Sequence, residues 1–246
     1  MNVHQLKISF LWTMILVLLK FSLTTAYAES KPDFKKYAAG PERKKFFINF
    51  VRPLIDKASI SIKEDRKFIL TLHNDIKHQQ KLSNSEIKKL SDLAKYYRVK
   101  EELSVATQLD ELKEKANVFP TSLILAQAIL ESAWGTSRFA VEGNNFFGQH
   151  CFSKGCGISA RGDKKVQVAK FPNVFDSVKS YYKNLNTGNS YKKLRRLRAE
   201  EIEKIKTMDS IELTAGLSHY SELKNGDYER RLNQVIKYNK LQQYDN

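Results

Sequence analysis

The residue best placed to do chemistry is a glutamate near the end of an apolar helix. The predicted helix opens with Pro120, which the first turn of a helix tolerates, and stops at Gly135. From Leu123 to Leu130 every residue except Gln127 is apolar, a pattern typical of a helix buried inside a domain. Glu131 shares a face with Gln127, one turn earlier. The sequence therefore predicts a carboxylate in largely apolar surroundings.

Burial and the negative end of the helix dipole both raise the pKa of a carboxylic acid in this position. An acid that stays protonated near neutral pH can protonate the leaving oxygen of a glycoside. The alternative is a structural glutamate, paired at the helix end with a base such as Arg138. Position alone leaves both interpretations of Glu131 open.

Several strings along the chain are similar to segments of one known family. They are AQAILESAWGTSRFA (126–140), EGNNFFGQHC (142–151), GCG (155–157), NLNT (184–187) and FFINFVRPLI (46–55). Together they resemble the bacterial glucosaminidase family (glycoside hydrolase family 73), and in particular its Bax-like members. The resemblance implies an enzyme that cleaves the glycan strands of peptidoglycan, with Glu131 as the general acid.

Most glycosidases need a second group besides the general acid. Many members of this family carry a second glutamate in the β lobe, but Asp163 is the only acidic residue between positions 143 and 173. Asp163 is therefore a candidate, although Gly-Asp-Lys is also an ordinary turn. A substrate with a 2-acetamido group can instead use its own carbonyl oxygen as nucleophile. Tyr220 is then the candidate to orient it, because LSHYS resembles a tyrosine motif of the family; the alternative is a core tyrosine.

Four residues are candidates for substrate binding, because aromatic rings can stack on sugars and an amide can bond an acetamido group. They are Trp134, Asn145, Phe147 and Tyr181. The alternative is structural: core positions for the rings and a turn for the amide. We expect no cofactor. Cys151 and Cys156 are predicted to form a disulfide or remain two thiols, since one nearby histidine is too few for a metal site.

The first 28 residues have the pattern of a secretory signal peptide. Lys7 precedes an apolar run, and Ala26-Tyr27-Ala28 forms a cleavage site. An uncleaved amino-terminal anchor is the alternative. Cleavage after Ala28 removes Lys7 and Lys20, which lowers the formal net charge from +15 to +13. We therefore expect export to the periplasm or cell envelope.

The strong positive charge favours polyanionic surroundings. Besides the peptidoglycan glycan strands, the candidate partners are anionic envelope polymers or a membrane surface; no nucleic acid is expected, since no recognition motif is present. The densest basic cluster is Lys192, Lys193, Arg195, Arg196 and Arg198. It is interpreted as a solvated helix face or, alternatively, a surface for acidic peptides or anionic polymers. We expect a monomer.

The remaining patterns are mostly helical. A capping box at Ser83 and Glu86 starts one helix, and Pro53 is expected to bend or reset another. Alternation over 165–171 predicts a short β-hairpin. We predict a mainly α fold with a small β-hairpin lobe: a lysozyme-like α+β catalytic domain at 116–246, preceded by a helical accessory region at 29–115.

Overall fold

The structure is a computed structural model that describes residues 31–153, 155–160, 163–205, 208–217 and 226–245. It gives only the backbone of residues 160, 163–166 and 205. The predicted signal peptide lies outside the described residues. Asp33–Asn246 forms a compact unit separate from Met1–Pro32. Among the described residues, no helix combines the length and the apolar character that a membrane span requires.

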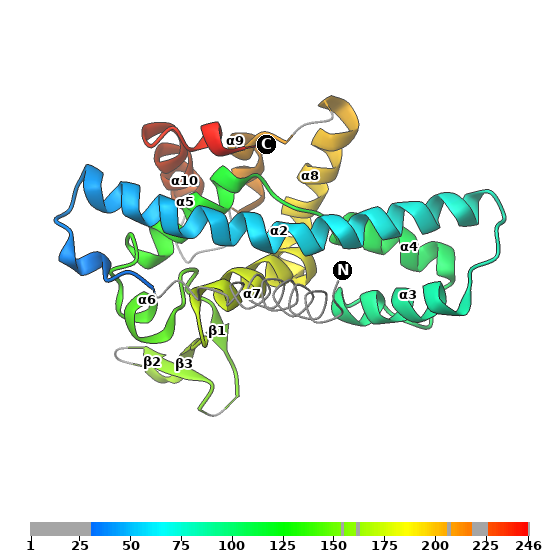
Figure 1. Cartoon of the computed structure of the whole chain (residues 1–246), viewed down its shortest axis with the longest axis horizontal. Helices are drawn as coiled ribbons and strands as arrows, with labels where there is room; N and C mark the ends of the chain where they lie inside the picture. Colours follow the sequence, from blue (N-terminus) through cyan, green and yellow to red (C-terminus); the bar gives the residue numbers. More distant parts are fainter. Residues whose placement is uncertain (1–30, 154, 161–162, 206–207, 218–225, 246) are drawn as a thin grey trace, which may run out of the picture. The chain divides into compact units, whose positions relative to one another are not determined.

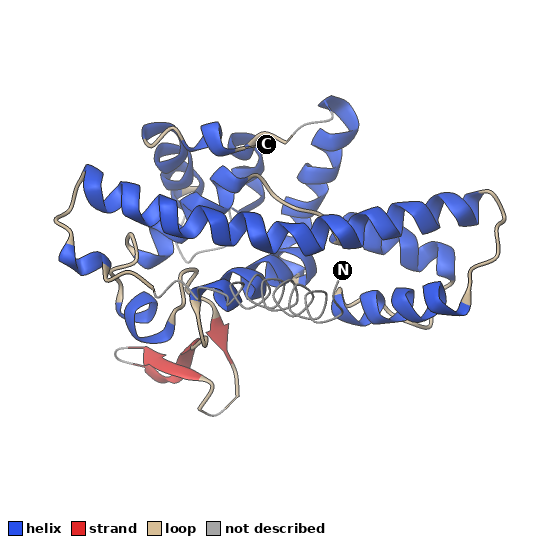
Figure 2. Cartoon of the chain, in the orientation of Figure 1, coloured by secondary structure: helices blue, strands red, loops and turns tan. Residues whose placement is uncertain are grey.

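Helices make up most of the unit from Asp33 onward (Figures 1 and 2). They are η1 (Phe34–Lys36), α2 (Pro41–Lys77), α3 (Asn84–Tyr96), α4 (Val105–Lys115), α5 (Thr121–Ser132), α6 (Arg138–Gly143), α7 (Val174–Thr187), η2 (Asn189–Tyr191), α8 (Lys192–Ile205), α9 (Ser210–Leu213), η3 (Thr214–Leu217), α10 (Asp227–Tyr238) and η4 (Leu241–Tyr244). The predicted capping box is present at the start of α3. The prediction of a mainly helical fold with a small β lobe is confirmed.

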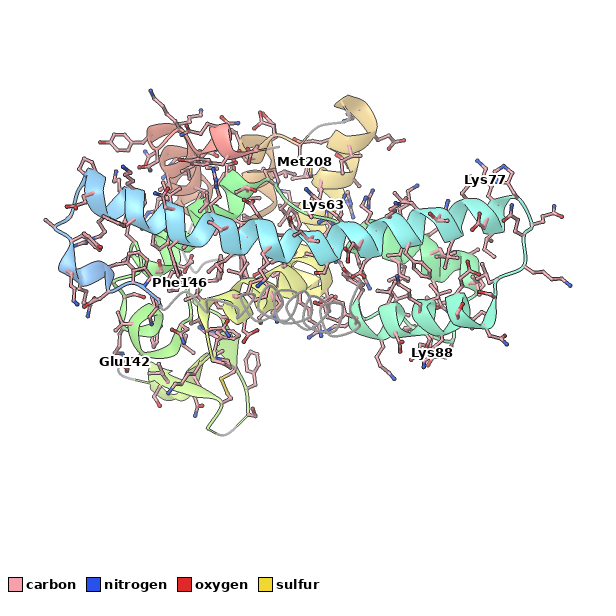
Figure 3. All side chains as sticks on the ribbon, in the orientation of Figure 1. Lys63, Lys77, Lys88, Glu142, Phe146 and Met208 are labelled. Atoms are coloured by element: carbon pink, nitrogen blue, oxygen red, sulfur yellow. A yellow bond between two sulfur atoms is a disulfide. The ribbon has the colours of Figure 1, made fainter. Side chains whose placement is uncertain are left out.

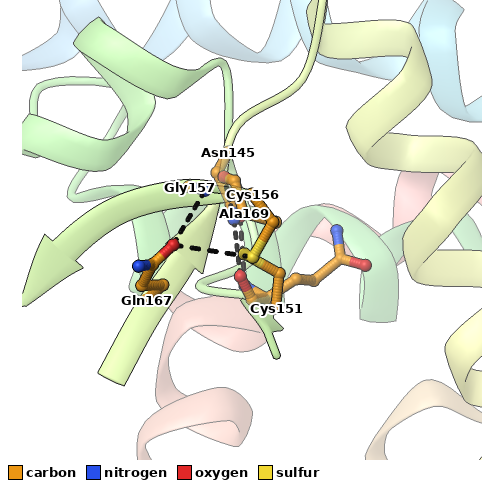
Figure 4. The surroundings of a disulfide bond; sticks show 7 residues. Asn145, Cys151, Cys156, Gly157, Gln167 and Ala169 are labelled. Carbon is orange, nitrogen blue, oxygen red and sulfur yellow. Dashed lines mark hydrogen bonds between the residues drawn. A yellow bond between two sulfur atoms is a disulfide. The ribbon is translucent and has the colours of Figure 1, made fainter. Parts of the chain in front are cut away.

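The β lobe is a three-stranded antiparallel sheet. Its strands are β1 (His150–Cys151), β2 (Gly157–Ala160) and β3 (Asp163–Ala169), in the order β1-β3-β2. The predicted hairpin is β2 and β3, and β1 is an additional strand. Cys151 and Cys156 form a disulfide beside Gln167, whose Oε1 accepts a hydrogen bond from the Gly157 amide (Figure 4). The disulfide closes the loop that joins β1 to β2.

The long helix α2 joins two hydrophobic cores. Its residues from Phe47 to Ile62 belong to the main core, which also contains α5, α7 and α10. Its residues Ile69 and Leu72 belong to a second cluster with α3 and α4, here called the distal core. Figure 3 shows exposed lysines such as Lys77 projecting from the helices around the distal core. Part of the predicted accessory region thus packs with α5, and a domain boundary at residue 116 stays a prediction.

Pro53 does not interrupt α2, so the helix is not reset there; the alternative expectation, a bend at Pro53, stays a prediction. Proline removes one backbone hydrogen bond and leaves a carbonyl one turn earlier without its intrahelical partner. Pro53 lies on the exposed side of α2. Water can bond the freed carbonyl there, which explains why the helix continues to Lys77.

Two arginines of the predicted basic face are buried instead. Arg195 and Arg198 are 2% and 1% exposed. The Arg198 guanidinium donates to the backbone oxygens of Asn117 and Glu114 and to Oδ1 of Asn186, at 2.8, 2.6 and 2.8 Å. Burial lowers the pKa of Arg198 to about 9. The expectation that these two residues form a solvated face or a polymer-binding surface was wrong: helical spacing identifies a face without showing what covers it.

Candidate active site

Glu131 lies in the last turn of α5, a helix whose side chains are almost all buried. The side chain itself is half-buried. Removal of water raises the pKa of Glu131 above its ordinary value, because the charged carboxylate loses hydration. The direction agrees with the sequence-based expectation. The environment therefore favours the protonated acid.

The first α10 tyrosine contacts this carboxyl group. Tyr228 is 4% exposed, and its hydroxyl donates a hydrogen bond to Oε1 of Glu131 at 2.9 Å. This bond stabilises the ionised carboxylate, so it lowers the pKa of Glu131 and partly opposes the effect of burial. The resemblance to the tyrosine motif of the family included the Asp227-Tyr228 pair, but Tyr220 was chosen from it as the candidate. The residue that bonds Glu131 in the structure is Tyr228.

A glycine lies beside the other carboxyl oxygen. Gly148, in the loop between α6 and β1, has φ +63°, and a Cβ built on it would lie 3.2 Å from Oε2 of Glu131. A larger residue would be strained in this left-handed conformation and would crowd the acid. The FFGQ segment of the sequence signature thus supplies backbone that approaches Oε2 closely.

The chain leaves α5 through a left-handed turn. Ala133, Trp134 and Gly135 have φ values of 51°, 57° and 77°. A Cβ on Gly135 would lie 2.3 Å from Cδ2 of Phe34, so only glycine fits beneath that ring. Non-glycine residues in this conformation are uncommon and persist where their surroundings hold them. Phe34, from the amino-terminal region, helps to fix the turn that follows Glu131.

Tyr191 is another aromatic residue near the acid. It lies in η2 and is 7% exposed. Burial raises the pKa of Tyr191 well above its ordinary value, and the negative charge of Glu131 raises it further. The Tyr191 phenol is therefore within electrostatic reach of Glu131, a relation that the sequence did not indicate.

Two of the predicted sugar-binding rings are core residues. Phe147 and Tyr181 are each 0% exposed and stack on one another, with centroids 4.1 Å apart and planes 8° apart. Neither ring has a free face for a sugar, which corrects the expectation that they bind substrate directly. Because the two residues are far apart in sequence, spacing could not reveal that they pack together.

The predicted amide ligand is also structural. Asn145 is 0% exposed, and its Oδ1 accepts hydrogen bonds from the backbone amides of Phe147 and Gln149 at 3.2 and 3.1 Å. Its Nδ2 donates to the carbonyl oxygens of Gln149 and Ala169, both at 2.9 Å. Asn145 therefore ties the FFGQ loop to the β lobe, as Figure 4 shows in part, rather than meeting a sugar.

Trp134 is the one predicted substrate-binding residue that reaches the surface. It is half-buried, packs edge-to-face on Phe47 with centroids 5.5 Å apart, and lines a groove between α2, α5 and α10.

Arg138, the base considered above as an ion-pair partner of Glu131, forms an ion pair with Glu142 instead, at 3.8 Å. Among the described residues, Arg138 thus forms no ion pair with Glu131.

The side chains of two predicted catalytic residues lie outside the described part of the structure. Asp163 begins β3, where its backbone pairs with Ala160, but its side chain is outside the described part. Tyr220 falls within 218–225, also outside it. Their catalytic roles stay predictions. Within the described residues, no three His, Cys, Asp or Glu side chains gather as a metal site would require.

The chain is similar to one known protein family and to named proteins of two bacteria. The glucosaminidase family model, described as mannosyl-glycoprotein endo-beta-N-acetylglucosaminidase, matches residues 106–241. Protein bax of Escherichia coli (strain K12) is 34% identical over 74% of this chain and 64% of its own length. The exo-glucosaminidase LytG of Bacillus subtilis (strain 168) is 27% identical over 54% of this chain and 49% of its own. The chain thus covers less than two thirds of either relative.

Among solved structures, the chain is similar to the catalytic domain of the autolysin Auto from Listeria monocytogenes. The two are 21% identical, with a TM-score of 0.45, over 85% of this chain and 91% of that domain. The family-model match includes Glu131, Gly148 and Tyr228, the residues that meet at the candidate site.

Proposed function

Since the chain belongs to the glucosaminidase family of glycoside hydrolases, we propose that it is an exported peptidoglycan hydrolase, an endo-β-N-acetylglucosaminidase. It would cleave the GlcNAc-β-1,4-MurNAc linkage with Glu131 as general acid. The observation that carries the proposal is the environment of Glu131: half-buried at the end of α5, with the pKa of its carboxyl group raised by loss of water. An acid of this kind is what leaving-group protonation requires.

The contacts of Glu131 suggest which oxygen delivers the proton. Tyr228 donates to Oε1, so Oε1 acts as acceptor and Oε2 is the oxygen left to carry the proton. Gly148 adds no side chain beside Oε2. In this arrangement Tyr228 orients the acid, and Oε2 protonates the glycosidic oxygen as the bond to the sugar breaks.

The second half of the reaction has two candidate routes. Asp163 could act as the second carboxylate, or the 2-acetamido group of the substrate could attack the anomeric carbon while Tyr220 orients it. The chemistry needs only one protein carboxylate in the second route. Asp163→Asn and Tyr220→Phe distinguish the routes, because the first substitution should abolish turnover only if Asp163 participates.

We also propose where the protein acts and which molecules it contacts. The amino-terminal pattern supports export to the periplasm or cell envelope, where the glycan strands of peptidoglycan would be the substrate. The net charge supports contact with anionic envelope polymers or a membrane surface. The description of the family model names an endo-beta-N-acetylglucosaminidase, whereas the relative LytG is called an exo-glucosaminidase. Endo cleavage therefore predicts a range of glycan lengths, whereas exo cleavage releases terminal units only.

The decisive experiment compares wild type with Glu131→Gln on purified sacculi, followed by mass spectrometry of the soluble products. We expect wild type to release fragments with reducing-end GlcNAc and Glu131→Gln to release about 10²-fold less or none. Glu142→Gln is the matched control, because Glu142 is an exposed glutamate. Anhydro-MurNAc ends would indicate a lytic transglycosylase and reducing MurNAc ends a muramidase. Sedimentation with sacculi without cleavage would indicate a binding module.

A further inference from the structure

A large groove is lined by residues of α5 and α10, the two helices that carry Glu131 and Tyr228. It has a volume of about 970 Å³ and runs along α10 between α2 and the end of α5. Leu130 and Trp134, which line it, stand on either side of Glu131 in sequence. This volume is at the upper end of ordinary ligand sites. The groove is separate from the carboxyl group but shares its supporting helices, which Figure 1 shows together.

The groove is strongly cationic. Lys44, Arg230, Arg231 and Lys237 line it, and no described lining residue is acidic. Arg230 forms an ion pair with Asp227, outside the groove. Arg231 and Lys237 are exposed on α10. Charges of one sign gathered in a concave site raise the local concentration of an oppositely charged ligand.

Lys44 is held in a defined position. Its ammonium group lies 5.3 Å from the centre of the Trp134 ring and 4.5 Å from that of Tyr238, and it donates to Oδ1 of Asn239 at 3.0 Å. Contacts with two rings fix a lysine that would otherwise be mobile. Tyr238 is 80% exposed and forms an outer wall. Cations and aromatic walls together suit a ligand with both carboxylate and apolar parts.

The groove has the length of a short peptide. Its α10 residues run from Arg230 to Tyr238, eight helical steps of about 1.5 Å or about 12 Å. An extended peptide advances about 3.3–3.6 Å per residue, so about three or four residues fit. At one end, Arg231 is three residues from Tyr228, about 4.5 Å along the helix axis from the residue that bonds Glu131.

We propose that this groove binds a short acidic peptide attached to the glycan strand. If the proposed function holds, the substrate carries such peptides on its MurNAc sugars, and their free carboxylates would meet Lys44, Arg231 and Lys237. The peptide would occupy the groove while the sugar linkage lies against Glu131. The basic face predicted on α8 is not needed for this role, since two of its arginines are buried.

The test measures binding without glycan, so that its outcome does not depend on cleavage. The probe is a fluorescent tetrapeptide of the peptidoglycan type with free carboxylates, followed by anisotropy in low salt. We expect saturable binding that weakens about tenfold or more in Lys44→Ala/Arg231→Ala/Lys237→Ala. The same weakening is expected when the peptide carboxyls are amidated and when the salt is raised to 0.5 M.

Control variants distinguish binding in the groove from nonspecific electrostatic attraction to the basic protein. Lys45→Ala removes the same charge from the neighbouring exposed lysine of α2, which does not line the groove, and should bind normally. Equal binding of the amidated peptide, or equal binding by the triple variant, would overturn the proposal. Groove-dependent binding of polyphosphate or anionic vesicles in place of the peptide would also overturn it. Thermal melting checks that each variant is folded.

A second measurement connects the groove to catalysis. The ratio of kcat/KM on peptide-bearing strands to that on amidase-stripped strands should exceed one for wild type and fall about tenfold in the triple variant, through KM. An unchanged ratio would contradict a role in substrate recognition. Peptide binding without any glycan cleavage would mean that the proposed function fails while the peptide site stands.

Discussion

At the scale of single residues, burial and one hydrogen bond have opposite effects on the pKa of Glu131. Burial raises the pKa of its carboxyl group, and the Tyr228 hydroxyl lowers it. The carboxyl group can therefore be tuned by substitution at the tyrosine, without any change to the acid itself.

Tyr228→Phe removes the hydrogen bond to Oε1 but keeps the ring in the core. The pKa of Glu131 should rise, because the ionised form loses a donor. The alkaline limb of the kcat/KM profile should therefore move to higher pH. Tyr244→Phe, at a half-buried tyrosine of η4 beside Arg52, is the control and should leave the profile in place. A shift to lower pH would show that the hydroxyl does not stabilise the carboxylate.

Glu131→Gln should stabilise the protein near neutral pH. The raised pKa of Glu131 means that the folded chain binds this proton where the unfolded chain has lost it, so stability falls as pH rises above about 4.3. A neutral amide removes this cost. We expect a Tm about 2–4 °C higher at pH 7 and a difference that closes below pH 4. Glu142→Gln should change Tm little, and a lower Tm for Glu131→Gln would refute the argument.

At the scale of elements, the Arg198 side chain holds the end of α4 against α7 and α8. Its guanidinium reaches backbone carbonyls at 114 and 117 and the Asn186 side chain in one planar group. A lysine ammonium cannot reproduce this fork. Arg198→Lys should therefore lower the free energy of unfolding by about 3 kcal/mol or more, measured by urea denaturation. Arg196→Lys, an exposed neighbour, should cost less than about 0.5 kcal/mol.

Sequence-based prediction succeeded for the features that local residue patterns determine. The capping box of α3, the buried character of α5 and the position of Glu131 follow from residue types and their spacing. It missed what depends on tertiary contact. The stacking of Phe147 on Tyr181 and the hydrogen bond from Tyr228 to Glu131 join segments far apart in the chain. Periodicity names the face of a helix, but only packing decides what lies against it.

At the scale of the molecule, α2 couples the distal core to the core around the active site. The two clusters share this helix while their other helices differ. Leu72→Ala should cost about 2–5 kcal/mol, because Leu72 is fully buried in the distal core. Amide exchange should then quicken in α3 and α4 much more than in α5 and α10. Equal acceleration everywhere would show that the two clusters open as one unit. Val105→Ala, at a more exposed site on α4, is the control.

The contact of Phe34 with Gly135 bears on how this fold can diverge. An aromatic ring from the first described helical turn occupies the space that any side chain at 135 would need. Neither position can be exchanged alone for a bulkier residue without displacing the turn after Glu131. Substitutions at these two sites, a hundred residues apart, should therefore accumulate in pairs among descendants of this chain. A chimera that takes its amino-terminal segment from one homologue and its catalytic helix from another would inherit mismatched halves of that contact.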